Sequence, residues 1–196
     1  MPLPARFSKG DLMDHKGTKT LETERLILRR FKVGDYDQMY KNWASEDKVT
    51  EFLTWPTHTS PEISKMVLES WVPQYEKDDY YHWGIELKET KELIGSLAAV
   101  EVIENTLAAN IGYCIGSRFW GNGYVPEAGK AVIKYLFEEC GFQRIAACHA
   151  KENPKSGRVM QKIGMTYEGT HRMGGKCNKG IIDEIWYSIL KSEYMK

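Results

Sequence analysis

A glycine-rich turn separates an apolar, strand-like segment from a predicted helix in the stretch IGYCIGSRFWGNGYVPEAGK, residues 111–130. Gly121 and Gly123 allow backbone conformations that other residues avoid, so the chain can turn sharply between the two elements. Pro126 and Glu127 follow, and both are typical of the first turn of a helix. Because the N–H groups at a helix start are free, a glycine turn of this kind commonly binds phosphate.

Three phosphate-binding patterns compete for this turn. A P-loop needs Lys-Ser or Lys-Thr after its second glycine, and neither is present there. A dinucleotide fingerprint needs a third glycine where Pro126 stands and an acid at the end of the next strand, which instead ends in His149 and Ala150. The remaining pattern, Arg/Gln-x-x-Gly-x-Gly/Ala, runs from Arg118 to Gly123. A plain tight turn without a ligand is the alternative to all three.

The segments before the turn predict strands and helices from their apolar spacing. Residues 34–44 have helical spacing, and Ser60-Pro61 begins a second helix that Pro73 stops or kinks. The predicted strands cover residues 21–31, 80–87, 92–103 and 107–115, of which the last three form an antiparallel meander because their links are short.

The segments after the turn complete a mixed α/β pattern. A helix follows the turn and ends at Gly141, and Asn153-Pro154 opens a shorter helix that Gly164 closes. Residues 144–150 predict a buried strand, and residues 181–190 predict a long strand that pairs with residues 166–172 through a turn at 174–180. We expect residues 1–20 to form an arm outside the core and residues 21–196 to form one domain.

Composition excludes several classes of protein. The 196 residues carry 27 basic and 27 acidic side chains, which argues against a protein that mainly coats nucleic acid or an anionic membrane. The four cysteines form no C-x-x-C pair and show no zinc-ligand spacing, so we expect reduced thiols and no metal site. No signal region or membrane-length apolar run is present, which predicts a soluble, cytoplasmic protein.

Three ordered motifs give the chain a resemblance to a known family. TERLILRRF near the start, IGYCIGSRFWGNGYVPEA in the middle and HAKENPKSGRVMQKIGMTYEG later resemble the GNAT superfamily of N-acetyltransferases. More narrowly, they are similar to the branch that contains the bacterial ribosomal-protein N-terminal acetyltransferases, over residues 22–190. The resemblance implies an α/β GNAT fold: a mixed, strongly twisted sheet with an antiparallel meander and helices on both faces. It also implies that the cofactor sits where neighbouring strands splay after the meander.

The resemblance further implies acetyl-CoA as the acetyl donor and an amine as the acceptor. In the family the strand before the turn pairs its backbone with the pantetheine arm, and the amides of the turn hold the pyrophosphate. Arg158 is a candidate for the adenosine phosphate, with a solvated helix residue as the alternative. The cofactor residues that the resemblance indicates are Cys114, Ile115, Arg118, Gly121, Asn122, Gly123, Tyr124, Val125, Asn153 and Arg158.

Acetyl transfer also needs a proton for the departing thiolate. Superfamily members often supply it from a tyrosine, but Met160 occupies that position here. Ser156, three residues after Asn153, matches the serine proposed as the acid in the ribosomal branch. A helix serine bonded to its own backbone is the alternative.

The base is harder to assign. The branch often has a glutamate where this chain has Asn110, which cannot take a proton. Glu101 on the preceding strand is the next candidate, either as a base or as an ordinary exposed strand carboxylate. His82 and His149 titrate near neutral pH, but both lie in apolar strands.

Several functions remain open at this point. A protein N-terminal α-amine is the leading acceptor, and a polyamine, amino sugar or antibiotic is the alternative. A non-catalytic CoA-binding sensor is the rival from another class, and a nucleotide-dependent oxidoreductase is more distant. The aromatic residues Trp43, Phe52, Trp55 and Trp83 line either the acceptor pocket or the core. We expect a monomer or a homodimer that binds neither nucleic acid nor membrane.

Overall fold

The computed structural model describes residues 13–195, so the expectation for residues 1–12 lies outside the described residues. One eight-stranded sheet runs through the molecule in the order β1-β2-β3-β4-β5-β6-β8-β7. Its strands are β1 (Leu21–Glu22), β2 (Leu26–Arg29), β3 (His82–Leu87), β4 (Leu93–Ile103), β5 (Ala108–Ile115), β6 (Arg144–Ala150), β7 (Thr166–Cys177) and β8 (Gly180–Leu190). The α-helices are α1 (Tyr36–Met39), α2 (Asp47–Thr50), α3 (Pro61–Trp71), α4 (Tyr124–Glu138), α5 (Pro154–Lys162) and α6 (Lys191–Tyr194).

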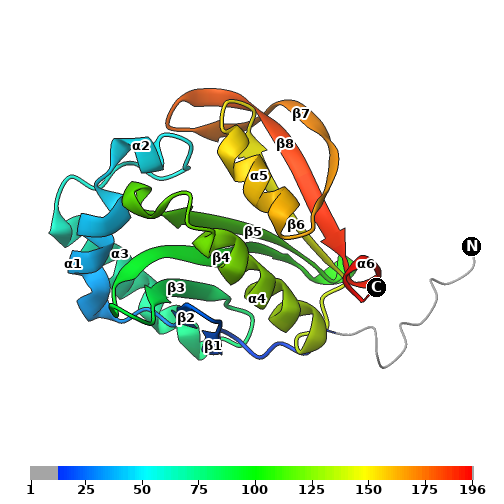
Figure 1. The fold of residues 1–196 in the computed structure, drawn as a ribbon, viewed down its shortest axis with the longest axis horizontal. Coiled ribbons are helices and arrows are strands. Elements are labelled where there is room, and N and C mark those ends of the chain that lie inside the picture. The colour runs from blue at the N-terminus through cyan, green and yellow to red at the C-terminus, as the bar shows by residue number, and fades with distance from the viewer. Residues whose placement is uncertain (1–12, 196) are drawn as a thin grey trace, which may run out of the picture.

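Helices cover both faces of this sheet, in agreement with β3, where successive side chains that point to opposite faces are all buried from His82 to Glu86. Trp83 and Ile85 of β3 belong to the larger apolar core, which also contains side chains of α4 and α5. Phe31 and Leu93 belong to a second core with the side chains of α1 and α3. Figure 1 shows α4 and α5 together over one face of the sheet. The expected fold class, a mixed sheet with a meander and helices on both faces, is confirmed.

The sheet opens between β5 and β6. Strands β3, β4 and β5 form the predicted antiparallel meander. Strand β6 then pairs with β5 in parallel, but only over Ala108↔Arg144, Ala109↔Ile145 and Asn110↔Ala146. Beyond Asn110 the two strands have no register partners in each other, although β5 continues to Ile115 and β6 to Ala150. The expected splay after the meander is therefore present.

Two sequence-based boundaries differ from the structure. Residues 34–44 do not form one helix: short η1 (Val33–Asp35) and α1 are followed by a π-helical turn, η2 (Tyr40–Ala44). The predicted turn at 174–180 is wrong, because β7 continues through Gly175 to Cys177 and the chain reverses at Asn178 and Lys179. Paired glycines are common in turns, but here irregular pairing between His171 and Gly175 keeps them inside the ladder. Pro73, in contrast, ends α3 and begins the 3₁₀ turn η3 (Val72–Glu76), as expected.

The segment at 13–20 lies against the sheet, which differs from the expected arm outside the core. The carbonyl of Gly17 accepts a hydrogen bond from the Tyr135 hydroxyl at 2.8 Å. Thr18 is buried, and its Oγ1 accepts from the backbone N–H of His82 at 2.9 Å. These partners lie more than 60 residues away in sequence, so no local pattern could indicate them. The division of the chain into an arm and one domain stays a prediction.

Candidate active site

The glycine turn presents free backbone N–H groups at the start of α4. Gly121 and Gly123 have φ values of 84° and 78°, in the region that favours glycine, and Gly123 is the N-cap of α4. Among the described residues, none accepts a hydrogen bond from the backbone N–H groups of residues 121–125. Pro126 has no N–H, so it leaves no further donor to satisfy. A Cβ built on Gly121 meets nothing within 4 Å, so the space beside these donors is open.

A carboxylate fastens the first turn of α4 to the β1–β2 turn. Glu127 accepts hydrogen bonds from Thr23 Oγ1 at 2.5 Å, from the Arg25 backbone N–H at 2.9 Å and from Arg25 Nε at 2.7 Å. Arg25 also donates to the carbonyl of Asn122 at 3.0 Å. Burial acts to raise the pKa of Glu127, but the bonds from Thr23 and Arg25 outweigh it and lower that pKa. In the sequence, TERLILRRF and Glu127 belong to two separate motifs. In the structure, Thr23 and Arg25 of the first motif bind Glu127 and so hold the glycine turn in place.

Replacing Glu127 with glutamine is expected to lower the free energy of unfolding by about 2 kcal/mol at neutral pH, the usual contribution of charged hydrogen bonds. Because the folded pKa is below its ordinary value of 4.5, the stabilisation is present above that value and is lost as the pH falls through the folded pKa. Urea unfolding at pH 7 and at about pH 3 measures this change. The matched variant Glu139→Gln, at the exposed end of α4, is expected to change stability little. An equal effect of both variants would contradict the prediction.

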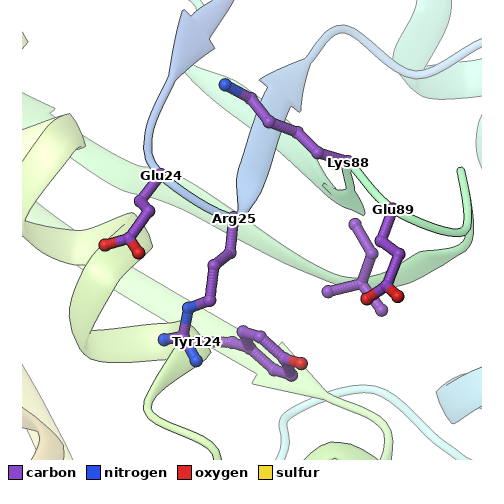
Figure 2. A pocket seen from close by; sticks show the side chains of 6 residues that line it. Glu24, Arg25, Lys88, Glu89 and Tyr124 are labelled. Carbon is purple, nitrogen blue, oxygen red and sulfur yellow. The ribbon is translucent and has the colours of Figure 1, made fainter.

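An open pocket of about 350 Å³ lies beside this contact, lined by Glu24, Arg25, Leu87, Lys88, Glu89 and Tyr124. Figure 2 shows the Arg25 guanidinium next to the Tyr124 ring, and its Cζ lies 4.6 Å from the ring centroid. Lys88 pairs with Glu22 at 3.0 Å. The acidic and basic side chains here offset one another, so the pocket has no single charge to select a ligand.

Two predicted cofactor residues use their side chains elsewhere. The Arg118 guanidinium donates to Asn42 Oδ1 at 2.9 Å and also pairs with Glu92. The Asn122 amide donates to the carbonyl of Phe119 at 3.1 Å and so braces the turn from inside. Both side chains therefore help to hold the turn, and the Arg118 side chain, which is 55% exposed, also remains accessible from solvent.

Only every second residue of β5 directs its backbone N–H and C=O groups toward the gap between β5 and β6. The N–H of Gly116 donates to Ile94 of β4, and successive residues of a strand direct their backbone groups to opposite sides. Cys114 therefore bonds to β4, whereas Ile115 faces β6. The carbonyl of Ile115 accepts from Trp120 Nε1 at 2.9 Å. Of the predicted pantetheine-pairing residues, Ile115 has the suitable orientation and Cys114 does not.

The N-terminus of α5 lies near the same turn. Asn153 is the N-cap of α5, but its side chain makes no capping bond, which leaves the amide available. Lys155 Nζ lies 4.9 Å from the centroid of the Trp120 ring, so a cation stands beside the glycine turn. Nothing in the sequence indicated that Lys155 lies beside the turn, because Trp120 is 35 positions away along the chain. Arg158 is exposed on α5, with no ion pair to a described residue.

Ser156 of α5 meets β5 across the splay. Its Oγ lies 2.9 Å from the hydroxyl of Tyr113, and that hydroxyl also donates to the Ser156 carbonyl at 3.0 Å. Burial raises the pKa of Tyr113, so this hydroxyl stays protonated at neutral pH. Sequence reasoning missed Tyr113, although it lies inside the quoted cofactor motif. The Ser156 hydroxyl therefore contacts the side chain of Tyr113 on β5. The alternative interpretation expected it to bond only to the backbone of its own helix.

Glu101 and Asn110 lie opposite each other on β4 and β5. The Asn110 amide donates to Glu101 Oε2 at 2.6 Å, and the pairing register shifts between Ala99 and Glu101. The resemblance led us to expect a carboxylate at position 110. Here the neighbouring strand β4 supplies one, because the shift in register brings Glu101 opposite Asn110. Glu101 is exposed, so it is accessible to an acceptor or to water.

Other candidates are core residues. Met160 is 1% exposed and packs in the larger core. Burial lowers the pKa of His82 to about 3, so this imidazole stays neutral, and the His149 ring packs against Gly157 of α5. Trp43 and Trp83 are fully buried, whereas Phe52 and Trp55 lie in the partly exposed loop after α2.

The thiols near the splay are protonated at neutral pH. Burial raises the pKa of Cys114 to about 11, and burial together with Glu184 raises the pKa of Cys148 to about 12. Since the thiolate is the nucleophile, neither cysteine is suited to carry an acetyl group. Within residues 13–195, no cluster of His, Cys, Asp and Glu could hold a metal ion, and no helix there has the length and apolarity needed to cross a membrane.

The sheet therefore opens after a short parallel pairing, and a glycine turn with free backbone N–H groups lies between the opening strand β5 and helix α4. A family model described as an acetyltransferase (GNAT) domain matches residues 25–166, and the chain belongs to this family. It is an acetyl-CoA-dependent N-acetyltransferase.

Individual relatives agree with this assignment. The uncharacterised N-acetyltransferase YoaA of Bacillus subtilis is 33% identical over 171 residues, covering 87% of this chain and 96% of that protein. The crystal structure of a GNAT-family acetyltransferase from Bacillus anthracis matches with a TM-score of 0.79 at 25% identity, covering 89% of this chain and 99% of that one. The [ribosomal protein uS5]-alanine N-acetyltransferase of Escherichia coli is 30% identical over 90 residues, covering 45% of this chain and 46% of that protein.

Proposed function

We propose that this protein acetylates the α-amine of a protein N-terminus by direct attack of the amine on acetyl-CoA in a ternary complex. The observation that carries the proposal is the splay of β5 from β6, with free amides at residues 121–125 and the Ser156 hydroxyl beside it. The similarity to an alanine N-acetyltransferase of a ribosomal protein supports a protein terminus over a small amine.

The chain's own residues fit acetyl-CoA as the donor. The N–H groups of residues 121–125 and the cation of Lys155 suit a pyrophosphate, because both favour anionic oxygens at a helix start. The edge of β5 at Ile115 and the free amide of Asn153 suit the amide groups of pantetheine. When bound, acetyl-CoA supplies a thioester carbonyl that a neutral amine can attack.

Three side chains would then serve the reaction. Ser156, oriented by Tyr113, would donate a proton to the leaving sulfur. Glu101 would take the proton of the amine, directly or through water, while Asn110 orients its carboxylate. Because an N-terminal amine has a pKa near ~8, only modest help is needed to deprotonate it. Asn153 would position the pantetheine arm near the reacting atoms.

Release of free CoA thiol tests the proposal directly. The assay would combine acetyl-CoA with peptides that begin with alanine, serine or methionine and, separately, with spermidine and glucosamine. We expect release that depends on a peptide with a free N-terminus and is absent when that terminus is blocked. Release with a small amine alone would replace the protein terminus by that amine as the acceptor. Tight acetyl-CoA binding without release for any acceptor would favour a CoA-binding sensor.

Mass spectrometry of the protein after incubation with acetyl-CoA alone tests the order of steps. Since Cys114 and Cys148 are protonated at neutral pH, we expect no acetylated enzyme. Intersecting initial-rate lines would agree with a ternary complex, and a stable acetyl-enzyme would contradict it.

A further inference from the structure

Glu184 of β8 is a partly buried carboxylate to which the reaction described above assigns no role. Its Oε2 accepts a hydrogen bond from Trp186 Nε1 at 3.1 Å, and the nearby carboxylate adds to the effect of burial in raising the pKa of Cys148. His171 lies opposite Glu184 in the β7–β8 ladder, and its ring lies 5.4 Å from the Trp186 ring. In the part of the chain that the structure describes, no lysine, arginine or histidine forms an ion pair with Glu184. Trp186 Nε1 is the side-chain donor that the structure places on this carboxylate.

Glu184 lies near the segment that joins β6 to α5, the helix that carries Ser156. It is the register partner of Ala150, the last residue of β6, and the carbonyl of Ala150 accepts from the N–H of Asn153 at 2.7 Å. Neighbouring strands lie about 5 Å apart, so the Glu184 side chain starts one strand away from this point. Ser156 follows Asn153 within the first turn of α5.

The carboxylate is on the sheet face that α5 does not cover. Along β6, His149 packs under Gly157 of α5, so its neighbours Cys148 and Ala150 point to the opposite face. Glu184 is the register partner of Ala150 and therefore shares that face. Cys114 of β5 packs with the core of α1 and α3 on the same face. Donor-binding elements α4 and α5 are thus on one side of the sheet and Glu184 is on the other.

The β7–β8 hairpin also closes onto the loop that carries the partly exposed aromatics. The Asn178 amide at its tip donates to the carbonyls of Thr50 and Trp55, both at 2.8 Å. In Figure 1 the tip of this hairpin reaches the region of α2. The same hairpin therefore holds Glu184 and Trp186 and contacts the loop with Trp55.

We propose that Glu184 first binds the acceptor amine as an ammonium ion, with Trp186 holding the carboxylate in place. Glu101 then takes one proton from this ammonium, directly or through water, and the neutral amine attacks. This inference rests on the proposed function and names the residue that selects a cationic acceptor. A carboxylate offers about four acceptor positions, of which Trp186 uses one, and a primary ammonium brings three donors. The aromatic ring of Trp186 adds a surface that suits a cation.

Gly175 makes room for this carboxylate. A Cβ on Gly175 would enter the space that Glu184 Oε1 occupies, and this atom is the far end of a flexible side chain. The same Cβ would lie 2.6 Å from Cδ and 2.9 Å from Cγ of Glu184, so Gly175→Ala displaces this side chain from Cγ outward and keeps its charge. Glu184→Gln removes the charge and keeps an oxygen that can accept from Trp186.

The test measures KM for an alanine-initiated peptide amide and for spermidine, together with the Kd of acetyl-CoA and the Tm, in Glu184→Gln, Gly175→Ala and the control Glu152→Gln. Glu152 is an exposed carboxylate just before Asn153, so it reports the effect of losing any nearby negative charge. We expect both site variants to raise the acceptor KM about tenfold or more, as loss of a charged hydrogen bond does. The Kd of acetyl-CoA and the Tm should stay unchanged in both.

The outcomes separate this inference from the proposed function. An acceptor KM within twofold of wild type in Glu184→Gln or in Gly175→Ala overturns the inference while the transferase stands. The same rise in Glu152→Gln also overturns it, because the effect would then be a general loss of charge. If the wild-type protein turns over neither amine, the proposed function fails, and the inference fails with it. Should Glu184→Gln not fold, the KM of Gly175→Ala decides.

Discussion

Alanine in place of Ser156 is expected to lower kcat by about a hundredfold or more while the Kd of acetyl-CoA stays within about twofold, which is the usual effect of losing a general acid. The hydroxyl lies in the first turns of α5, and Tyr113 orients it from across the splay. The Tyr113 hydroxyl keeps a partner in the variant, because it still donates to the carbonyl of residue 156. Stability should therefore change little, and the loss should fall on the chemical step. Steady-state kinetics with calorimetry of acetyl-CoA binding measure both quantities.

The matched variant is Tyr113→Phe, which leaves the Ser156 hydroxyl in place but removes the side chain that orients it. We expect a smaller fall in kcat, about tenfold, because only the orientation is lost. A Ser156→Ala enzyme that keeps kcat within about threefold of wild type would show that the proton comes from elsewhere. If only Tyr113→Phe lowered kcat, the roles of the two hydroxyls would be reversed.

The second large effect is expected at Gly121. Valine there should weaken acetyl-CoA binding about a hundredfold or more, since its side chain would enter the open space beside the free N–H groups of the turn. The φ of 84° adds strain of about 1–2 kcal/mol, because residues with a Cβ rarely adopt this conformation. Calorimetry of acetyl-CoA binding and a thermal melt would separate the lost affinity from the strain.

Gly180 provides the control for this strain. It has a φ of 107°, its Cβ position is also open, and it lies at the start of β8, away from the glycine turn. Gly180→Val should lower the Tm by a similar amount and leave the Kd of acetyl-CoA unchanged. Equal losses of affinity in both variants would mean that strain, and not the blocked amides, weakens binding.

The agreement between sequence and structure is closest where the signal is local. The meander followed from short polar links between apolar segments, and α4 followed from Gly123, Pro126 and its apolar face. The break at Pro73 followed from the missing N–H of proline. Where a residue type alone was ambiguous, local reasoning failed: Gly174 and Gly175 suggested a turn, but strand pairing with β8 holds them in β7.

Much of the candidate site depends on contacts between distant segments. Glu127 meets Arg25 from 102 positions away, and Tyr113 meets Ser156 from 43. Aromatic residues gave equal support to a pocket and to a core, and only packing showed that Trp43 and Trp83 belong to the core. Position in a sequence does not specify which face of the sheet meets which helix, because that depends on register and on the order of the strands.

The sequence by itself determined the elements of the proposed acetyl-CoA site. The glycine turn, helix α4 behind it and the N-cap Asn153 are each defined within a few residues, because backbone conformation and capping are local properties. The proposed acceptor site was decided by tertiary structure. A register shift in β4 brings Glu101 opposite Asn110. The pairing of β8, the last strand in the chain, with β6 brings Glu184 next to Ala150. Both carboxylates reach the proposed acceptor site through pairing between strands, and such pairing depends on the packing of the whole sheet.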